Sequence, residues 1–320
     1  MRTFEGFADV WTPVLHRRKL TAKPLRLVIA NEPLVLFRDG RGGVGALLDR
    51  CPHRGVALSL GKVGDDGTLE CPFHGWRFDV SGANRHVPLN PEARCENLAA
   101  AALPVREIGD LIWIYTRPNA VDPPEPMVPE GLTDPGLLRT NIDRDWACHW
   151  TRAMENMLDS PHLPFVHRKT IGRAYRRKMT RESRMDIEWE DTPFGGRIRA
   201  SLDGEASGGY LEFYQPNIMA LHIPIPGRTL RLHALVIPTE SGRTHLTIVA
   251  ARDFARFAVL EPLFRRMNGR IADEDRAVVE SSGPNEVPRA GQEHSVGSDR
   301  ATLQFRRYYD AVLRGRAAES

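Results

Sequence analysis

The chain has 320 residues, of which 41% are hydrophobic and 27% charged, and its formal net charge is +3. This length and composition predict a globular protein of two domains. The charge is nearly balanced, and no basic stretch is interleaved with aromatic residues, which argues against nucleic-acid binding. No segment approaches the apolar length of a membrane span, and the N-terminus lacks a signal-peptide core. We therefore expect a soluble, cytoplasmic protein.

The first part of the chain reads as short β-strands joined by turns. Leu25–Ile29 and Leu34–Phe37 are apolar runs, and Asp39–Gly43 is typical of a hairpin turn. Leu103–Tyr115 contains two more apolar runs around a Gly-Asp pair. The pattern predicts an all-β domain over residues 1–118, with its compact part from about residue 40.

Two short loops inside this predicted domain each pair one cysteine with one histidine. The ligand candidates are Cys51 with His53 and Cys71 with His74. Two thiolates and two imidazoles at this spacing suit a 2Fe–2S cluster held by cysteines on one iron and histidines on the other. Prolines after the cysteines and glycines at the loop ends favour tight, preset turns. Zinc is the main alternative, although zinc fingers usually present a cysteine pair and then a histidine pair.

Two other cysteines, Cys95 and Cys148, lie outside these loops. They could form a disulfide, but an intracellular setting predicts reduced thiols. We interpret both as structural or incidental residues without a part in the chemistry.

The second half of the chain predicts a different architecture. A proline-rich stretch marks a linker over residues 119–140, and residues 141–320 form the second domain. A strand over 141–150 leads into a helix over 151–158, and helices are expected at 255–281 and 299–314. Five segments between them alternate in polarity and predict five or six antiparallel strands, at 185–189, 197–202, 210–214, 230–238 and 243–250. The chain as a whole is expected to be α+β, with a curved antiparallel sheet around helices that leaves room for a pocket.

A second candidate metal site begins where the helix over 151–158 ends. His162 and His167 are five residues apart, and on an ideal helix they would point about 140° away from each other. Pro161 and Pro164 break the helix and let the chain bend, so both imidazoles can be aimed at one point. Two histidines and one carboxylate on one face are the ligands of a mononuclear iron that activates oxygen.

The carboxylate must come from elsewhere, and residues 272–280 offer four candidates. These are Asp273, Glu274, Asp275 and Glu280. Each observation also has a plainer interpretation when taken alone. Two nearby histidines are commonly unrelated surface residues, an acidic run is usually a solvated helix face, and Asp159 could simply end a helix.

Residues 51–76 resemble the cluster motif of Rieske proteins, and the whole chain resembles the alpha subunit of a Rieske non-heme iron oxygenase. The resemblance implies a Rieske 2Fe–2S domain followed by a helix-grip-like catalytic domain that holds iron at His162, His167 and Asp275. It also implies a head-to-tail homotrimer in which Asp159 bridges His162 to His74 of the next subunit. Asn156 carries over weakly as a polar residue near the iron.

The resemblance further implies an enzyme that uses O₂ and electrons from a partner protein. A ferredoxin or an NAD(P)H-dependent reductase is expected, since the sequence has no glycine-rich dinucleotide loop. The chain length is similar to that of the monooxygenase and demethylase branch, which predicts hydroxylation or oxidative demethylation of an aromatic or polycyclic small molecule. The alternatives are cis-dihydroxylation and an electron carrier without oxygenase activity. Arg173–Lys178 is a solvated basic face or a docking patch for an acidic donor. Candidate pocket residues, most of which could also be plain core, are Trp150, Met154, Met157, Tyr210, Met219, Leu221, His222 and Ile223.

Overall fold

The structure is a computed structural model that describes residues 3–289, 291–316 and 318. The chain divides into two compact units, Met1–Pro126 with Leu313–Ser320 and Met127–Val312. The boundary lies inside the predicted linker, but the last residues belong to the first unit and not to the second. Thr3 pairs with Ala318, and the Gly6 amide donates to the Arg316 carbonyl at 2.7 Å. Pairing between the two chain ends leaves no local pattern that sequence analysis can detect.

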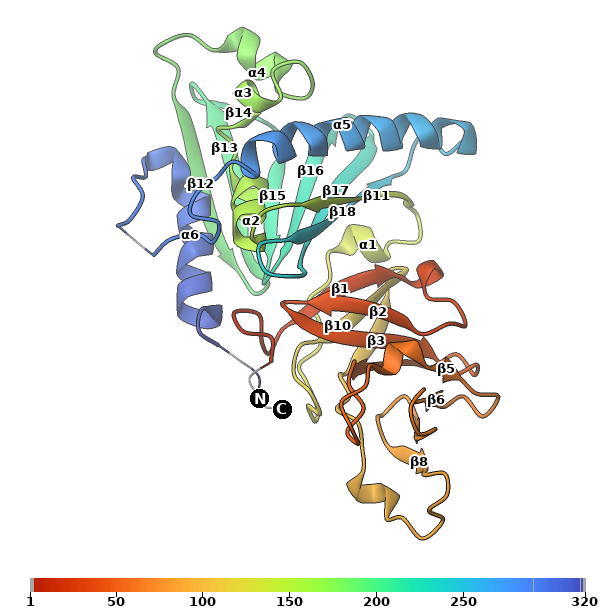
Figure 1. The fold of residues 1–320 in the computed structure, drawn as a ribbon. Coiled ribbons are helices and arrows are strands. Elements are labelled where there is room, and N and C mark those ends of the chain that lie inside the picture. Colours follow the sequence, from red (N-terminus) through yellow and green to blue (C-terminus); the bar gives the residue numbers. More distant parts are fainter. Residues whose placement is uncertain (1–2, 290, 317, 319–320) are drawn as a thin grey trace. The chain divides into compact units, whose positions relative to one another are not determined.

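The first unit consists of small antiparallel sheets, drawn in red to yellow in Figure 1. The predicted hairpin turn at Asp39–Gly43 is present, because Asp39 Oδ1 accepts hydrogen bonds from the amides of Arg41 and Gly43 at 2.8 Å. The sheets run in the orders β1-β10-β9, β2-β3-β4 and β5-β6-β7-β8. Their bounds are β1 Trp11–His16, β2 Leu25–Ile29, β3 Glu32–Arg38, β4 Val44–Leu48, β5 Lys62–Val63, β6 Leu69–Glu70, β7 Arg77–Phe78, β8 Asn84–His86, β9 Val105–Ile108 and β10 Leu111–Tyr115.

The core of this unit lies directly beneath the two Cys–His loops. Phe37, Leu47 and Phe78 are fully buried in one cluster that also contains Cys51 and Cys71. Burial of such apolar side chains is the main source of stability in a small domain. The two cysteines are therefore fixed by the core, while the residues that follow them extend towards the surface.

The second unit is built on one antiparallel sheet in the order β11-β18-β17-β16-β15-β13-β12, with β14 beside β13. The sequence missed β16, whose apolar residues are interrupted by His222 and Pro224, so neither strict alternation nor a continuous apolar run is present. The strand before α2 begins at Leu138, inside the predicted linker. The bounds are β11 Leu138–Trp146, β12 Met185–Thr192, β13 Gly195–Leu202, β14 Glu205–Ala206, β15 Tyr210–Tyr214, β16 Ile218–Ile225, β17 Arg228–Pro238 and β18 Thr244–Arg252.

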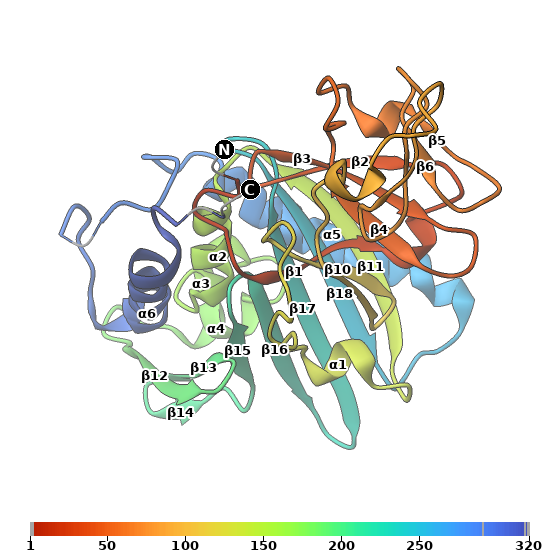
Figure 2. The same cartoon turned by 90° about the horizontal axis from the view of Figure 1, so that it is seen from below.

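Helices cover the sheet of the second unit (Figures 1 and 2). Helix α2 packs on β16 and β17, α5 on β11, and α6 on β12. Phe305 of α6 makes edge-on ring contacts with Trp150 of α2 at 5.8 Å and with Phe213 of β15 at 5.7 Å. These elements confirm the expected α+β architecture. The helices are α1 Glu130–Thr133, α2 Trp150–Leu158, α3 Leu163–Val166, α4 Arg173–Lys178, α5 Glu261–Val279 and α6 Arg300–Tyr308.

Helix α5 begins six residues later than predicted, because bends and a short 3₁₀ turn precede Glu261 and Pro262 occupies its first turn. Short 3₁₀ segments also occur at Arg17–Lys19, Leu58–Leu60, Cys95–Asn97, Ala258–Leu260 and Gly297–Asp299. Among residues 3–289, 291–316 and 318, no helix combines the length and the apolar character needed to cross a bilayer.

Candidate functional site

The two Cys–His loops of the first unit have the same backbone conformation and hydrogen bond. In each loop the cysteine carbonyl accepts a hydrogen bond from the glycine four residues later, Gly55 at 2.8 Å and Gly75 at 3.0 Å. Both glycines have positive φ, 73° and 69°, a conformation that a residue with a side chain adopts only with strain. The proline and glycine positions of the sequence thus produce two matching turns that face each other.

The four predicted cluster residues come together in this pair of loops. The rings of His53 and His74 have centroids 4.7 Å apart, and His53 stacks on Trp76 at 4.6 Å. Burial raises the pKa of the Cys51 thiol, and the facing thiol of Cys71 adds to the rise. Two facing thiols, one of them buried in this way, suit a metal, because a bound cation replaces the thiol protons. His53 Nδ1 is buried and has no hydrogen-bond partner among the described residues, as expected of a metal-binding nitrogen.

In the second unit, a single turn of helix separates the two predicted iron-binding histidines. Helix α2 begins after His149, whose side chain accepts from the Thr151 amide, and it ends at Leu158 before Asp159. Helix α3 then runs only from Leu163 to Val166. His162 and His167 lie immediately before and after α3, and their ring centroids are 5.2 Å apart. The chain bends between α2 and α3, as expected from the prolines in this segment, and the bend brings the two rings together.

Both histidines direct the same ring atom towards Asp275. Asp275 Oδ1 lies 3.0 Å from His167 Nε2 and 3.5 Å from His162 Nε2. One ligand atom from each residue falls within 4.8 Å of the others. Asp275 Oδ1 is buried and has no hydrogen-bond partner in the described part of the chain, so the close approach is not a hydrogen bond in its geometry. Two neutral nitrogens and one carboxylate oxygen fit a divalent iron.

Of the four acidic candidates, Asp275 is the one on the buried face of helix α5. The buried face of α5 repeats at Asn268, Ala272, Asp275 and Val279, which is the spacing of one helix face. Asp273 points elsewhere and pairs with Arg144 at 2.8 Å. Glu280 accepts a hydrogen bond from the Ala147 amide at 2.7 Å. A carboxylate on the buried face of a helix is costly unless a cation or a hydrogen-bond donor compensates its charge. The two histidines beside Asp275 could hold such a cation.

Glu274 has a different place, on the outer side of His167. Its Oε2 lies 2.9 Å from His167 Nδ1 and accepts a hydrogen bond from Thr170 Oγ1 at 2.6 Å. Burial raises the pKa of Glu274, but hydrogen bonds from Thr170 and His167 outweigh burial and hold the pKa below its ordinary value. An ionised carboxylate only accepts hydrogen bonds, so His167 Nδ1 donates to Glu274, and Nε2 on the other side of the ring faces Asp275.

Asp159 takes the corresponding place beside His162. Its Oδ2 accepts a hydrogen bond from the His162 amide at 3.1 Å and lies 3.4 Å from His162 Nδ1. His162 Nδ1 itself has no hydrogen-bond partner among the described residues. Each of the two histidines therefore has one nitrogen towards Asp275 and the other towards a separate carboxylate, an arrangement common around metal-bound histidines.

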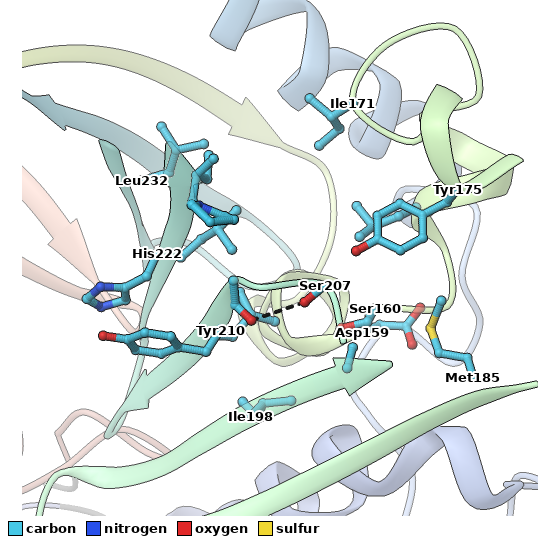
Figure 3. Close-up of a pocket in the computed structure, with 17 residues that line it drawn as sticks. Asp159, Ser160, Ile171, Tyr175, Met185, Ile198, Ser207, Tyr210, His222 and Leu232 are labelled. Carbon is cyan, nitrogen blue, oxygen red and sulfur yellow. Dashed lines mark hydrogen bonds between the residues drawn. The ribbon is translucent and has the colours of Figure 1, made fainter. Parts of the chain in front are cut away.

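Asp159 lies on the wall of an apolar cavity of about 370 Å³. Figure 3 shows this cavity with Tyr175 and Asp159 on the right of the view, Leu232 at the upper left and Ile198 at the bottom. Of the residues predicted for a pocket, Tyr210, Leu221, His222 and Ile223 border it. Trp150, Met154, Met157 and Met219 are buried core residues instead.

A second cavity of about 310 Å³, lined mainly by polar residues, lies on the other side of Asp159 and also includes Asn156 and His162. A network of two arginines and two glutamates forms part of its wall. Arg152 lies 2.7 Å from Glu293, and Arg306 bonds both Glu293 and Glu155. The network ties α2 to α6 and so supports the helix that ends at Asp159. Asn156 lines this cavity together with His162.

The sequence did not predict the roles of three residues in this region. Gly172 donates its amide to the His167 carbonyl at 3.0 Å and leaves no room for a Cβ beside the Leu163 carbonyl. Tyr175 lies within the basic run Arg173–Lys178, whose charges obscured its position on the apolar cavity. Glu274 was considered only as a metal ligand. Each of these roles depends on a tertiary contact, and only the residue type of Gly172 offered a hint.

An all-β unit with paired Cys–His loops, joined to an α+β unit with a two-histidine, one-carboxylate cluster, fits an iron–sulfur protein with an additional mononuclear iron site. Comparisons with known proteins agree with this class. Residues 10–104 match the Rieske [2Fe-2S] domain, and residues 146–315 match the vanillate O-demethylase oxygenase C-terminal domain. The chain belongs to the Rieske oxygenases that carry this C-terminal domain.

Individual relatives agree with this assignment. Chlorophyllide a oxygenase from Chlamydomonas reinhardtii is 27% identical over 98% of this chain and 49% of its own length. The oxygenase component of dicamba O-demethylase from Stenotrophomonas maltophilia is 35% identical over 50% of this chain and 47% of its own length. The chain thus spans about half the length of the curated relatives it matches. A solved structure of the Pseudomonas putida CBB5 NdmA QL mutant with caffeine has a TM-score of 0.81 at 25% identity, covering 94% of this chain and 89% of that one.

Proposed function

We propose that this protein is the oxygenase component of a Rieske monooxygenase that hydroxylates or oxidatively demethylates an aromatic or polycyclic small molecule. The observation that carries the proposal is the convergence of His162, His167 and Asp275 within 4.8 Å, beside an apolar cavity. An electron carrier has no use for this cluster. The vanillate O-demethylase type of C-terminal domain and the similarity to dicamba O-demethylase favour demethylation over cis-dihydroxylation.

In this proposal the chain holds two metal groups through separate residues. Cys51, His53, Cys71 and His74 hold a 2Fe–2S cluster, and His162, His167 and Asp275 hold one iron. When bound, the cluster supplies single electrons and the mononuclear iron activates O₂. Glu274 fixes the ring orientation of His167, and Asp159 does the same for His162. The apolar cavity places the substrate and keeps water away from the reacting carbon.

We further propose that the active assembly is a head-to-tail homotrimer supplied by a ferredoxin or an NAD(P)H-dependent reductase. His74 is exposed, and the neighbouring Phe73 has 59% of its surface exposed, so the tip of this loop offers a ligand and an apolar contact to another protein. Asp159 would meet His74 of the next subunit across the polar cavity. A heterologous contact of this kind closes into a ring when the rotation permits. Sedimentation of the holoprotein as a trimer is the expected result, and a monomer would contradict it.

Metal analysis of two neighbouring variants tests the proposed function. Anaerobically purified protein should contain about three irons and two acid-labile sulfides per chain. Asp275→Ala should retain the cluster and its EPR signal after reduction while losing about one iron per chain. Asp273→Ala is the matched control, because it removes a carboxylate from the same helix. That carboxylate pairs with Arg144 and not with the histidines. With a reductase and a methoxylated aromatic compound, only the wild type and the control should consume O₂ and release formaldehyde. Two irons in all three proteins, unchanged by added ferrous iron, would leave only an electron carrier.

A further inference from the structure

One wall of the apolar cavity is a row of aliphatic side chains that runs across four strands. Ile198 of β13 pairs with Leu211 of β15, Leu211 pairs with Leu221 of β16, and Leu221 pairs with Leu232 of β17. All four residues line the cavity. Because paired residues in antiparallel strands project from the same face of a sheet, the row forms a continuous apolar surface.

The same alternation places the charged side chains of these strands on the opposite face. Arg197, which precedes Ile198, pairs across the strands with Glu212, and its guanidinium lies 2.9 Å from that carboxylate. His222, which follows Leu221, bonds Glu212 through Nε2 at 3.0 Å. Figure 3 shows the His222 and Tyr210 rings stacked together at the edge of the view, apart from Tyr175 and Ser160. These basic groups therefore neutralise Glu212 and are not directed at a ligand.

The polar groups that do face the cavity are hydroxyls and one carboxylate. Ser207 already donates its hydroxyl hydrogen to the Gly209 carbonyl at 3.1 Å. The hydroxyl of Tyr175 is directed into the cavity, and in the described part of the chain it takes part in no hydrogen bond. Tyr175 thus has a hydrogen-bond donor available for a ligand. The carboxylate is that of Asp159, beside His162.

The charge of the lining selects against anions. Among the described lining residues, none is an arginine or a lysine, and the imidazole of His222 is bonded to Glu212. The carboxylate in the lining, that of Asp159, has the wrong sign to bind an acid. None of the four basic residues of α4 lines the cavity, and two of them are engaged elsewhere, because Lys178 pairs with Glu205 and Arg176 lies over the ring of Phe165. A carboxylate moved from water into this cavity would lose its hydration without gaining a counter-ion.

We propose that the substrate is an uncharged, largely apolar ring compound with one carbonyl or ether oxygen that accepts a hydrogen bond from Tyr175. The inference rests on the proposed function, since it names the substrate class of the same site. The aliphatic row packs against the ring, and Tyr175 sets the orientation of the ring relative to the His162 end of the cavity. Aromatic acids are excluded by charge and not by size.

A pair of ligands with nearly the same shape tests the charge preference. 4-Methoxyacetophenone is neutral, and 4-methoxybenzoate is ionised at pH 8. Isothermal titration calorimetry of the holoprotein under nitrogen, without an electron donor, measures their binding independently of turnover. We expect the ketone to bind at least about tenfold more tightly, since an unpaired buried carboxylate costs more than 1.4 kcal/mol. Equal or tighter binding of the benzoate, or no binding of the ketone, would overturn the proposal.

Two tyrosine variants test the hydrogen bond. Tyr175→Phe should weaken ketone binding about three- to tenfold, the usual effect of one neutral hydrogen bond, while the benzoate stays the weaker ligand. Tyr214→Phe is the matched control, because it removes a hydroxyl from the opposite face of the same sheet, where Tyr214 bonds Glu212 at 3.3 Å. Equal loss in both variants, or none in Tyr175→Phe, would refute the role of Tyr175. The iron and sulfide content of the same samples reports separately on the proposed function.

Discussion

Glu274 and His167 form a carboxylate–imidazole pair in which Oε2 of the glutamate lies 2.9 Å from Nδ1 of the histidine, while Nε2 of the same ring faces Asp275. The pair comes from two distant parts of the chain, α5 and the segment after α3. Neighbouring acidic residues on α5 therefore have separate tasks. In the proposed site, Asp275 would bind the metal and Glu274 would orient the ring of His167, a second ligand.

Glu274→Gln should weaken iron binding without disturbing the cluster. The amide has nearly the same shape as the carboxylate but carries no charge, so it holds the His167 ring less firmly and lowers its basicity. We expect about a 10- to 100-fold lower affinity for ferrous iron, measured by titration of iron-depleted protein. Cluster absorbance should be unchanged. An unaltered affinity would mean that Thr170 alone is enough to hold this loop.

Gly172→Ala should displace the loop that carries His167. A Cβ at this position would overlap the Leu163 carbonyl oxygen, and the backbone of the loop cannot move without disturbing the Gly172–His167 hydrogen bond. The expected result is protein that keeps about two irons and two sulfides and has lost the third iron. Gly297→Ala is the control, since a Cβ there meets nothing within 4 Å. Full iron content in Gly172→Ala would contradict this interpretation.

Asp159→Asn should leave both metal groups bound and lower turnover about 100-fold or more. The amide oxygen still accepts from the His162 amide, so the local fold is kept, but the charge beside His162 Nδ1 is lost. Iron content, cluster EPR and O₂ consumption measure these outcomes together. Asp145→Asn, which changes an exposed carboxylate beside His245, serves as the control. Turnover near the wild-type rate would exclude a role for the Asp159 charge.

His233 should make the protein less stable as the pH falls below neutrality. Complete burial lowers its pKa from 6.5 to about 4, so the folded protein keeps this ring neutral while the unfolded chain protonates it. The unfolded state binds more protons between these values, and stability is lost as the pH falls from about 6.5 towards 4, by up to about 1.4 kcal/mol per pH unit. Urea unfolding of wild type and His233→Gln from pH 7.5 to 5 should show a shallower slope in the variant.

His245, on the adjacent strand, gives a control of opposite sign. Burial lowers its pKa, but hydrogen bonds to Asp143 and Asp145 outweigh burial and raise it above the ordinary value. Its stabilising contribution is complete below pH 6.5 and is lost as the pH rises through the folded-state pKa. His245→Gln should therefore lose stability mainly at low pH. Equal slopes in all three proteins would show that neither histidine governs the pH dependence.

The sequence predicted the parts of the site that depend on local spacing. Cys51 with His53 and Cys71 with His74 lie in short loops, and prolines around His162 signalled the break between α2 and α3. The choice among four acidic residues could not be made locally, because all of them lie in one short stretch of helix. In the structure the buried face of α5 includes Asp275, which lies beside both histidines, whereas Asp273 pairs with Arg144.

The remainder depended on contacts between distant segments. Pairing of Gly6 with Arg316 assigns the C-terminal residues to the first unit, and nothing near either residue predicts it. Strand β16 was missed because Pro224 and His222 obscure its pattern, although it contributes Leu221 to the apolar row. Tyr175 is noticeable in the sequence only as a member of a basic run, so its place on the cavity could be found only in the structure.

Asp159 belongs to the walls of both cavities, the apolar one and the polar one. A molecule in the first and a protein surface at the second would therefore act on the same carboxylate. If occupation of one cavity changes the affinity of the other, thermodynamic linkage requires the reverse effect to be equally large. Substrate binding and partner binding would then be coupled through the Asp159 side chain. The affinity for a neighbouring subunit or an electron donor would depend on whether substrate is bound.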